Sequence, residues 1–239
     1  MQTIDSTSPA SEITRRLRRV ILSRTVATGD QFPPERQLAE AFGVSRGSVR
    51  DALRTLQAEG LVTVRVGAKG GTFVTKPPPG LIAERITHML ALDDLSPAQV
   101  TEARAVLELG AIPLACRRAQ EADLRELEAL TDRAEVALRE GEHDFHHSVA
   151  FHVALARASH SPATAIIIDA LHEPVLRSMI RAAAKAPHMA EQGIAEHRQL
   201  IDALRRRDER EAQEILALHL RRLLERIDGD TTILPSFDT

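Results

Sequence analysis

Residues 35–59, with the sequence ERQLAEAFGVSRGSVRDALRTLQAE, constrain the fold of this chain more than any other stretch. Their spacing predicts two short helices joined by a tight turn. The first helix runs from Glu35 to Phe42 and ends at Gly43, which tolerates the backbone conformation of such a turn. Ser45 occupies the N-cap position of the second helix, where its hydroxyl can accept a hydrogen bond from a free backbone N–H.

The second predicted helix combines an apolar face with a basic one. Its apolar arc consists of Val49, Ala52, Leu53 and Leu56. The other side carries an arginine at every fourth position, with a glycine beside them: Arg46, Arg50, Arg54 and Gly47. An apolar face can hold the helix on its domain while the arginines reach phosphates or guanine edges in a major groove. A solvated arginine-rich helix is the alternative, but the preceding helix and turn favour a DNA recognition helix.

A β-hairpin is predicted directly after this helix. Residues 61–66 (LVTVRV) and 72–75 (TFVT) are rich in β-branched residues, and the turn GAKGG between them carries Lys69 at its tip. A basic, glycine-rich hairpin beside a recognition helix can act as a wing that reaches the neighbouring minor groove or the DNA backbone.

Residues 11–76 resemble the winged helix-turn-helix domain of the GntR family of bacterial transcription regulators. The matching run is GDQFPPERQLAEAFGVSRGSVRDALRTLQAEGLVTVRVGAKGGTFV. The resemblance implies DNA contacts by Arg36, Arg46, Arg50, Gly70 and Gly71. The predicted interface is completed by further residues of the recognition helix, its cap and the hairpin tip: Ser45, Gly47, Ser48, Arg54 and Lys69. Gly47 and Ser48 stand where the family often has a larger residue and a proline.

Charge is divided unevenly along the chain. Residues 1–80 carry 12 Lys and Arg against 7 Asp and Glu, whereas residues 81–239 carry 19 against 27. A basic N-terminal part on an acidic body suits a protein that contacts nucleic acid with one end. The single cysteine, Cys116, is expected to be a buried hydrophobe in a reducing compartment. No signal peptide and no apolar run of about 20 residues are found, so we expect a bacterial cytoplasmic protein outside the membrane, at the nucleoid when bound to DNA.

The proline-rich run 76–80 (KPPPG) marks the predicted domain boundary. We expect a mobile N-terminus at 1–10, the winged helix-turn-helix at 11–76, a linker at 77–80, a helical effector and dimerisation domain at 81–229 and a tail at 230–239. Helical periodicity predicts helices at about 81–92, 97–119, 121–140, 143–158, 163–185, 188–206 and 209–228. The predicted fold is mainly α: a winged helix-turn-helix followed by an all-α antiparallel bundle.

Three predicted helices of this second domain each place one histidine on an apolar face: His152, His197 and His219. A single inward histidine is usually a hydrogen-bonded core residue. Three of them each need a buried partner, and one shared transition metal would satisfy all three. Spacing alone leaves both interpretations open.

Residues 81–228 resemble the all-helical effector domain of the FadR-type subfamily. The similar segments are TEARAVLELGAIPLACRRA, SVAFHVALARASHSP and AEHRQLIDALRRRDEREAQEILALHLRRL. The resemblance implies a divalent metal bound by an aspartate and by His152, His197 and His219; because imidazole suits transition metals, we expect zinc or nickel. Ser148 occupies the aspartate position, and serine is a poor ligand. We expect three histidines completed by water or effector; a weakened or empty site is the alternative. Asp144 lies one turn further back, and His147 points elsewhere.

Arg104 also interrupts an apolar face, so its guanidinium needs a counter-charge. Glu108, one turn later, could supply one; alternatively, Arg104 binds a carboxylate ligand, which the resemblance favours.

We therefore predict a repressor that binds a short palindromic operator in double-stranded DNA as a homodimer and responds to a small carboxylate held near Arg104 and Ser148. The alternatives are a metal-free acyl-coenzyme A receptor or dimerisation domain on the same DNA-binding module, and a three-histidine metal hydrolase.

Overall fold

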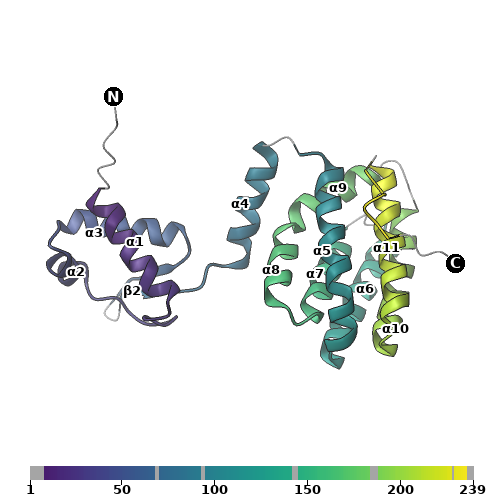
Figure 1. Ribbon diagram of the computed structural model, residues 1–239, viewed down its shortest axis with the longest axis horizontal. Coiled ribbons are helices and arrows are strands. Elements are labelled where there is room, and N and C mark those ends of the chain that lie inside the picture. Colours follow the sequence, from purple (N-terminus) through teal and green to yellow (C-terminus); the bar gives the residue numbers. More distant parts are fainter. Residues whose placement is uncertain are drawn as a thin grey trace. The chain divides into compact units, whose positions relative to one another are not determined.

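The computed structural model describes residues 8–67, 70–92, 95–141, 145–183, 188–227 and 229–235. The chain divides into two compact units, Met1–Leu81 and Ile82–Thr239 (Figure 1). The described residues are mainly helical, with one small sheet, which confirms the predicted fold class. None of the helices among these residues is both long and apolar enough to cross a membrane.

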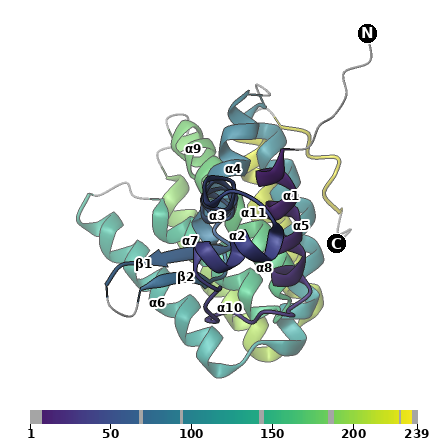
Figure 2. The same cartoon turned by 90° about the vertical axis from the view of Figure 1, so that its left-hand side faces the viewer.

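The first unit consists of three helices and a β-hairpin: α1 (Pro9–Leu22), α2 (Glu35–Phe42), α3 (Arg46–Ala58), β1 (Val62–Arg65) and β2 (Gly71–Val74). α1 begins at Pro9, where Ser8 caps it by accepting a hydrogen bond from the backbone N–H of Ser11. The strands pair antiparallel with Val62 opposite Val74 (Figure 2). Gln31 forms an isolated bridge to Phe73 and so ties the loop before α2 to the hairpin.

The turn between α2 and α3 has the predicted geometry. Gly43 adopts a left-handed conformation with φ of 66°, which a residue with a Cβ rarely adopts. The Ser45 hydroxyl accepts a hydrogen bond from the backbone N–H of Ser48 at 3.1 Å. The four apolar residues of α3 are buried in the core between α1, α2 and the hairpin: Val49, Ala52, Leu53 and Leu56. The opposite face of α3 is therefore left to solvent.

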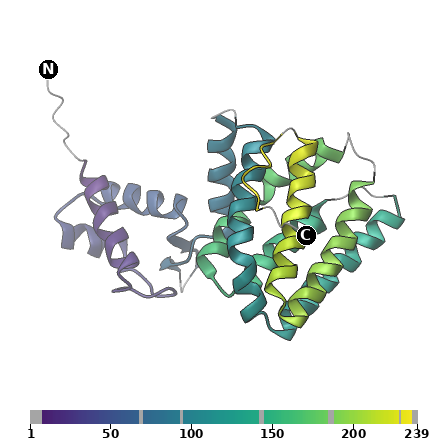
Figure 3. The same cartoon turned by 45° about the vertical axis from the view of Figure 1, so that its right-hand side comes forward.

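The helices of the second unit are α4 (Pro79–Leu92), α5 (Pro97–Arg118), α6 (Glu121–Arg139), α7 (His146–Ala158), α8 (Pro162–Ala170), α9 (His172–Ala183), α10 (Met189–Arg206) and α11 (Glu209–Arg226). α5 packs on α11 and α7, while α6 packs on α7 and α10. α10 and α11 run side by side (Figure 3). Apolar side chains from all five helices fill the main core, and Leu234 from the segment after α11 is buried in it.

The helix predicted at 163–185 is wrong, because the structure has two helices, α8 and α9, which meet at Leu171. Pro174 explains the break. Proline has no backbone N–H to donate to the carbonyl of Ala170, and its ring crowds that carbonyl, which favours a break there. The helix predicted from residue 143 begins at His146, and residues 142–144, which include Asp144, lie outside the described part of the chain.

Candidate metal centre and DNA-binding surface

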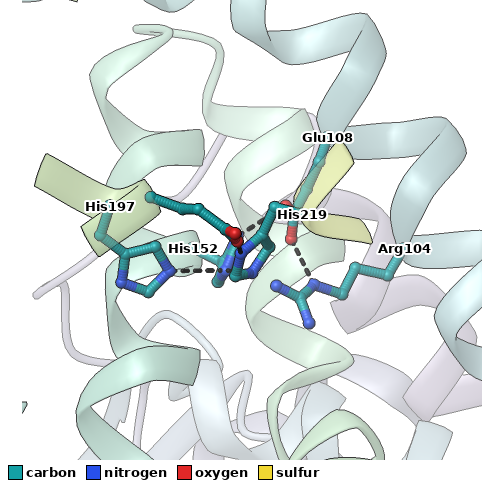
Figure 4. Close-up of polar contacts among 6 residues, drawn as sticks. Arg104, Glu108, His152, His197 and His219 are labelled. Carbon is teal, nitrogen blue, oxygen red and sulfur yellow. Dashed lines mark hydrogen bonds and ion pairs between the residues drawn. The ribbon is translucent and has the colours of Figure 1, made fainter. Parts of the chain in front are cut away.

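Three histidines from three helices meet in the second unit. His152 lies on α7, His197 on α10 and His219 on α11, and their ligand atoms lie within 4.8 Å of one another. The Nε2 atom of His152 is 3.2 Å from Nε2 of His197 and 3.2 Å from Nε2 of His219 (Figure 4). All three imidazoles thus turn the same nitrogen toward one point.

Two carboxylates fix the orientation of two of these rings. The Nδ1 atom of His152 lies 2.7 Å from an oxygen of Glu108 on α5, and Nδ1 of His219 lies 2.6 Å from an oxygen of Glu196. An ionised carboxylate can only accept, so each Nδ1 carries the proton and donates it. Each Nε2 is then left with a lone pair. Histidines that bind a metal through Nε2 have this arrangement, in which the second nitrogen donates to a carboxylate.

Burial holds the three histidines in their neutral form. It lowers the pKa of His152 to about 3 and that of His219 to about 4, and the positive charge of Arg104 acts in the same direction. Burial also lowers the pKa of His197 well below its usual value. Neutral imidazole is the form that binds transition metals. Burial raises the pKa of Glu108, but Arg104 and His152 outweigh it and lower that pKa to about 2, so Glu108 is ionised.

The convergence of these nitrogens fits a metal ion. With both Nδ1 atoms protonated, the Nε2 lone pairs of His152 and His219 face each other at 3.2 Å with no proton between them. If His197 carries its proton on Nε2, it can donate that proton to Nε2 of His152. This bond puts no proton between His152 and His219, so the repulsion between their lone pairs remains. Ligands at the 2.0–2.1 Å zinc–nitrogen distance of a tetrahedral site lie roughly 3.3 Å apart. The two measured separations, from His152 to His197 and from His152 to His219, therefore fit ligands of a shared transition metal.

A cavity opens beside the histidines. His197 and His219 line one end of it, and Ser148 lies in its wall, one helical turn before His152. The cavity volume is ≈ 50 Å³. A single water molecule needs about 10–15 Å³ on this scale, so the cavity has room for several water molecules or a small ligand. Its remaining polar wall is formed by Gln192, Glu196, Arg222 and Arg226.

Arg104 is buried behind His152 and is not part of the cavity wall. Its Nε donates to Glu108 at 2.6 Å, which is the internal counter-charge that the sequence offered as an alternative. Its Nη1 and Nη2 atoms are buried without a hydrogen-bond partner among the described residues. Two nitrogen donors of Arg104 are therefore buried without an acceptor among the described residues.

Glu196 and Arg222 were not predicted from the sequence. Arg222 forms an ion pair with the Glu196 carboxylate that also accepts from His219. No pattern along the chain links these residues, because their partners come from different helices. The Glu108 carboxylate was predicted only as a partner of Arg104, and its contact with His152 depends on how α5 packs on α7.

In the first unit the predicted arginines form an exposed surface. The exposed fractions of the Arg36, Arg50 and Arg54 side chains are 69%, 50% and 72%. Each has an acidic neighbour: Glu40 at 2.9 Å, Glu35 at 3.1 Å and Asp51 at 3.9 Å, respectively. Arg46 is exposed and has no partner among the residues that the structure describes. Gly47 and the capping Ser45 are exposed beside it, and Ser48 is half-buried.

The hairpin requires glycine at its turn. A Cβ on Gly70 would lie 2.5 Å from the backbone oxygen of Arg65 and 2.8 Å from that of Gly67. The Gln31 side chain donates to the Gly70 carbonyl at 3.1 Å, and a Cβ on Gly71 would collide with the same amide. Lys69, predicted at the tip, lies outside the described residues. The two glycines thus let the chain close tightly against Gln31.

A helix-turn-helix with exposed arginines and a glycine-rich wing, joined to a helical unit with a histidine cluster and a cavity, defines a DNA-binding transcription regulator with an effector domain. Residues 9–74 match the family described as bacterial regulatory proteins, gntR family, and residues 99–222 match the FCD domain. The chain belongs to the GntR family of transcription regulators and carries an FCD domain. The predicted family resemblance is confirmed, whereas the finer FadR-type assignment stays a prediction.

Individual relatives agree with this assignment. The transcriptional repressor NanR of Cronobacter sakazakii is 30% identical over 213 residues, which cover 85% of this chain and 79% of that protein. The transcriptional regulator LutR of Bacillus subtilis is 32% identical over 152 residues, which cover 63% and 68%. The solved structure of Streptococcus agalactiae GntR aligns with a TM-score of 0.66 at 25% identity and covers 90% of this chain and 99% of its own. The matched families and relatives are regulators and not enzymes, so the hydrolase alternative has no support.

Proposed function

We propose that this protein is a cytoplasmic repressor that binds a short palindromic operator as a homodimer and responds to a small carboxylate in its helical unit. One observation supports this most strongly: three neutral histidines turn their Nε2 atoms toward one point beside a small cavity, in a unit separate from the arginine surface. The relative from Cronobacter sakazakii is itself named a repressor.

In this proposal α3 enters the major groove of the operator. Arg46 and Arg50 reach base edges, because they occupy the exposed face at the N-terminal part of the helix. Arg36 and Arg54 contact phosphates on either side. The wing glycines allow the backbone of the hairpin, with Lys69 at its tip, to approach the DNA closely. Two copies related by a twofold axis would read the two halves of a palindrome.

The proposed effector site combines three histidine ligands with a metal coordination position that no side chain of the described residues occupies. His152, His197 and His219 would hold a divalent transition metal, zinc or nickel, which when bound supplies a Lewis acid for an anionic oxygen. Glu108 and Glu196 orient the rings. Ser148 places no carboxylate in the cavity wall, which leaves room for a carboxylate of the effector. The unpaired Nη groups of Arg104 add positive charge behind His152.

Effector binding would favour one arrangement of the dimer over another. A change in the spacing of the two recognition helices then lowers operator affinity. A coupling of about 1–3 kcal/mol between the two sites is ordinary for such regulators.

The DNA-binding part is tested with the full-length protein and the intergenic DNA upstream of its gene, by fluorescence anisotropy. The triple variant Arg36→Ala, Arg46→Ala, Arg50→Ala should bind roughly a hundredfold or more weakly, since each contact is worth about 1–3 kcal/mol. A matched control removes the same charge from exposed arginines of the second unit, Arg117, Arg125 and Arg210, and should bind normally. Normal binding by the first variant would refute the proposed interface.

The metal part is tested by elemental analysis of the protein after dialysis against zinc or nickel. One ion per chain is expected for the natural protein and for His188→Ala, whose side chain is exposed. His152→Ala should retain none. If the natural protein takes up no metal, or if His152→Ala takes up as much, the metal centre is excluded.

A further inference from the structure

We propose that the cavity binds a short dicarboxylate: one acidic group lies at the histidine end, and the second binds Arg226 and Gln192 at the other end. This inference rests on the proposed function, in which the helical unit senses a small carboxylate. It adds a second anion-binding subsite, formed by α10 and α11, and thereby the class of effector.

The long axis of the subsite follows α11. His219, Arg222 and Arg226 are spaced by three and four residues, so they share one face of this helix, and all three line the cavity. At a rise of 1.5 Å per residue, Arg226 starts about 10 Å further along the helix axis than His219. The cavity wall therefore has an imidazole at one end and a guanidinium at the other, with Arg222 between them.

The two guanidiniums differ in how their charge is balanced. Arg222 is ion-paired with Glu196, so its charge already has a partner in the wall. Arg226 donates through Nη2 to the amide oxygen of Gln192 at 3.1 Å, and no carboxylate of the described residues is paired with it. A neutral amide does not neutralise a guanidinium. Arg226 therefore has unused donors and an uncompensated charge at a cavity wall.

A carboxylate matches this pair of side chains. The guanidinium has five N–H donors in a planar fork that fits both oxygens of a carboxylate. Gln192 uses its oxygen as the acceptor from Arg226, so its amide nitrogen can donate to the same ligand. Together the two residues can supply donors to both oxygens of one acidic group.

Part of the cavity wall favours a hydrocarbon link. Besides the Arg222–Glu196 ion pair, whose two charges are matched to each other, the wall contains the apolar side chains of Leu138 of α6, Met179 of α9 and Leu223 of α11. Hydroxyl groups of a sugar acid placed against these residues would lose their water without gaining partners. A dicarboxylate with a short unsubstituted chain joins two acidic ends by a hydrocarbon link that these apolar side chains can cover, and the small cavity limits its length.

The test compares matched acids by isothermal titration calorimetry on the zinc-loaded, full-length protein. Succinate, glutarate and adipate are each paired with the monocarboxylate of equal carbon number: butyrate, valerate and hexanoate. An added charge-assisted contact worth about 1.5–3 kcal/mol should make at least one dicarboxylate roughly 10- to 150-fold tighter than its partner. In Arg226→Gln this ratio should fall to near one, while monocarboxylate affinity and zinc content stay unchanged. The control Arg210→Gln, an exposed residue of α11, should keep the ratio.

The outcomes separate this inference from the function on which it rests. If monocarboxylates bind as tightly as all their dicarboxylate partners, or if Arg226→Gln keeps the preference, the second subsite is refuted while carboxylate sensing stands. If neither acid type binds, both the sensing function and the subsite are refuted. Operator binding and circular dichroism of Arg226→Gln report whether the variant is folded, and Arg226→Lys, which keeps the charge but not the fork, should recover only part of the preference.

Discussion

At the scale of single residues, Glu108 joins the buried arginine to the histidine cluster. One carboxylate oxygen accepts from Arg104 at 2.6 Å and the other from Nδ1 of His152 at 2.7 Å. Glu108→Gln would leave Arg104 buried without a counter-charge, at a cost of about 3–5 kcal/mol in the free energy of unfolding. Weaker orientation of His152 should lower zinc affinity about 10- to 100-fold.

Urea unfolding and zinc titration of the same samples measure the two effects. Glu214→Gln is the matched control, because that half-buried carboxylate forms an ion pair with the exposed Arg210 on the same helix and lies outside the histidine cluster. It should change stability by no more than about 0.5 kcal/mol. Equal stability of Glu108→Gln and the natural protein would contradict the assigned role of Glu108 as counter-charge.

Cys116 should be unreactive in the native protein. Its side chain is buried in α5, and burial, assisted by the nearby Glu209 carboxylate, raises the pKa of the thiol to about 11. The thiolate is the reactive form, so alkylation by iodoacetamide should be slow throughout the range of about pH 7 to 9, where only a small fraction of this thiol is ionised. In denaturant, where the pKa is about 8.5, labelling should be fast. Mass spectrometry follows the reaction, and rapid labelling of the native protein would contradict the burial of this thiol.

At the scale of elements, the start of α2 constrains an arginine of α3. Glu35 accepts from Nε of Arg50 at 3.3 Å and from Nη2 at 3.1 Å. These bonds orient the guanidinium and leave its Nη1 donors free for a base edge. Glu35→Gln removes a negative charge from the DNA-facing surface and weakens this orientation. We expect tighter binding to scrambled DNA, and a ratio of operator to scrambled affinity that falls several-fold.

Fluorescence anisotropy with both DNAs, repeated at several salt concentrations, measures this ratio. Glu40→Gln is the control, since it removes an equal charge from the partner of Arg36 without touching Arg50. An unchanged ratio in Glu35→Gln, or an equal fall in both variants, would mean that Glu35 does not orient Arg50 for recognition.

The elements that the sequence predicted are those set by local signals. Gly43 and Ser45 mark the turn by their own backbone and capping chemistry, and the apolar arc of α3 marks its buried face. Periodicity placed each of the three histidines on the apolar face of its helix, but their convergence depends on how α7, α10 and α11 pack. The break at Leu171 was missed because the apolar residues on both sides of it continue one helical period. Pro174 therefore did not stand out as a boundary. Glu196 and Arg226 were missed because their contacts are made between helices, which no spacing along one helix reports.

At the scale of the whole molecule, the two units have separate hydrophobic cores. The apolar cluster of the first unit contains residues from Ile13 to Val74, and the main cluster of the second runs from Ala105 to Leu234. All three histidines belong to the second unit, whereas the predicted DNA-binding residues belong to the first. Any effect of effector on operator affinity is therefore a coupling between two cores, and it must be reciprocal.

This division predicts that metal stabilises one unit only. A ligand that binds only the folded state at 100 times its Kd adds about 2.7 kcal/mol, which for a unit of this size raises the midpoint of unfolding by roughly 5–10 °C. Calorimetry with zinc should shift the transition of the helical unit and leave that of the winged helix in place. His152→Ala should show no shift, and His188→Ala should show the full one, because its imidazole is exposed and lies outside the cluster. A chelator should reverse the shift. A shift of both transitions by the same amount would mean that the units unfold together and that the histidine cluster stabilises the DNA-binding fold as well.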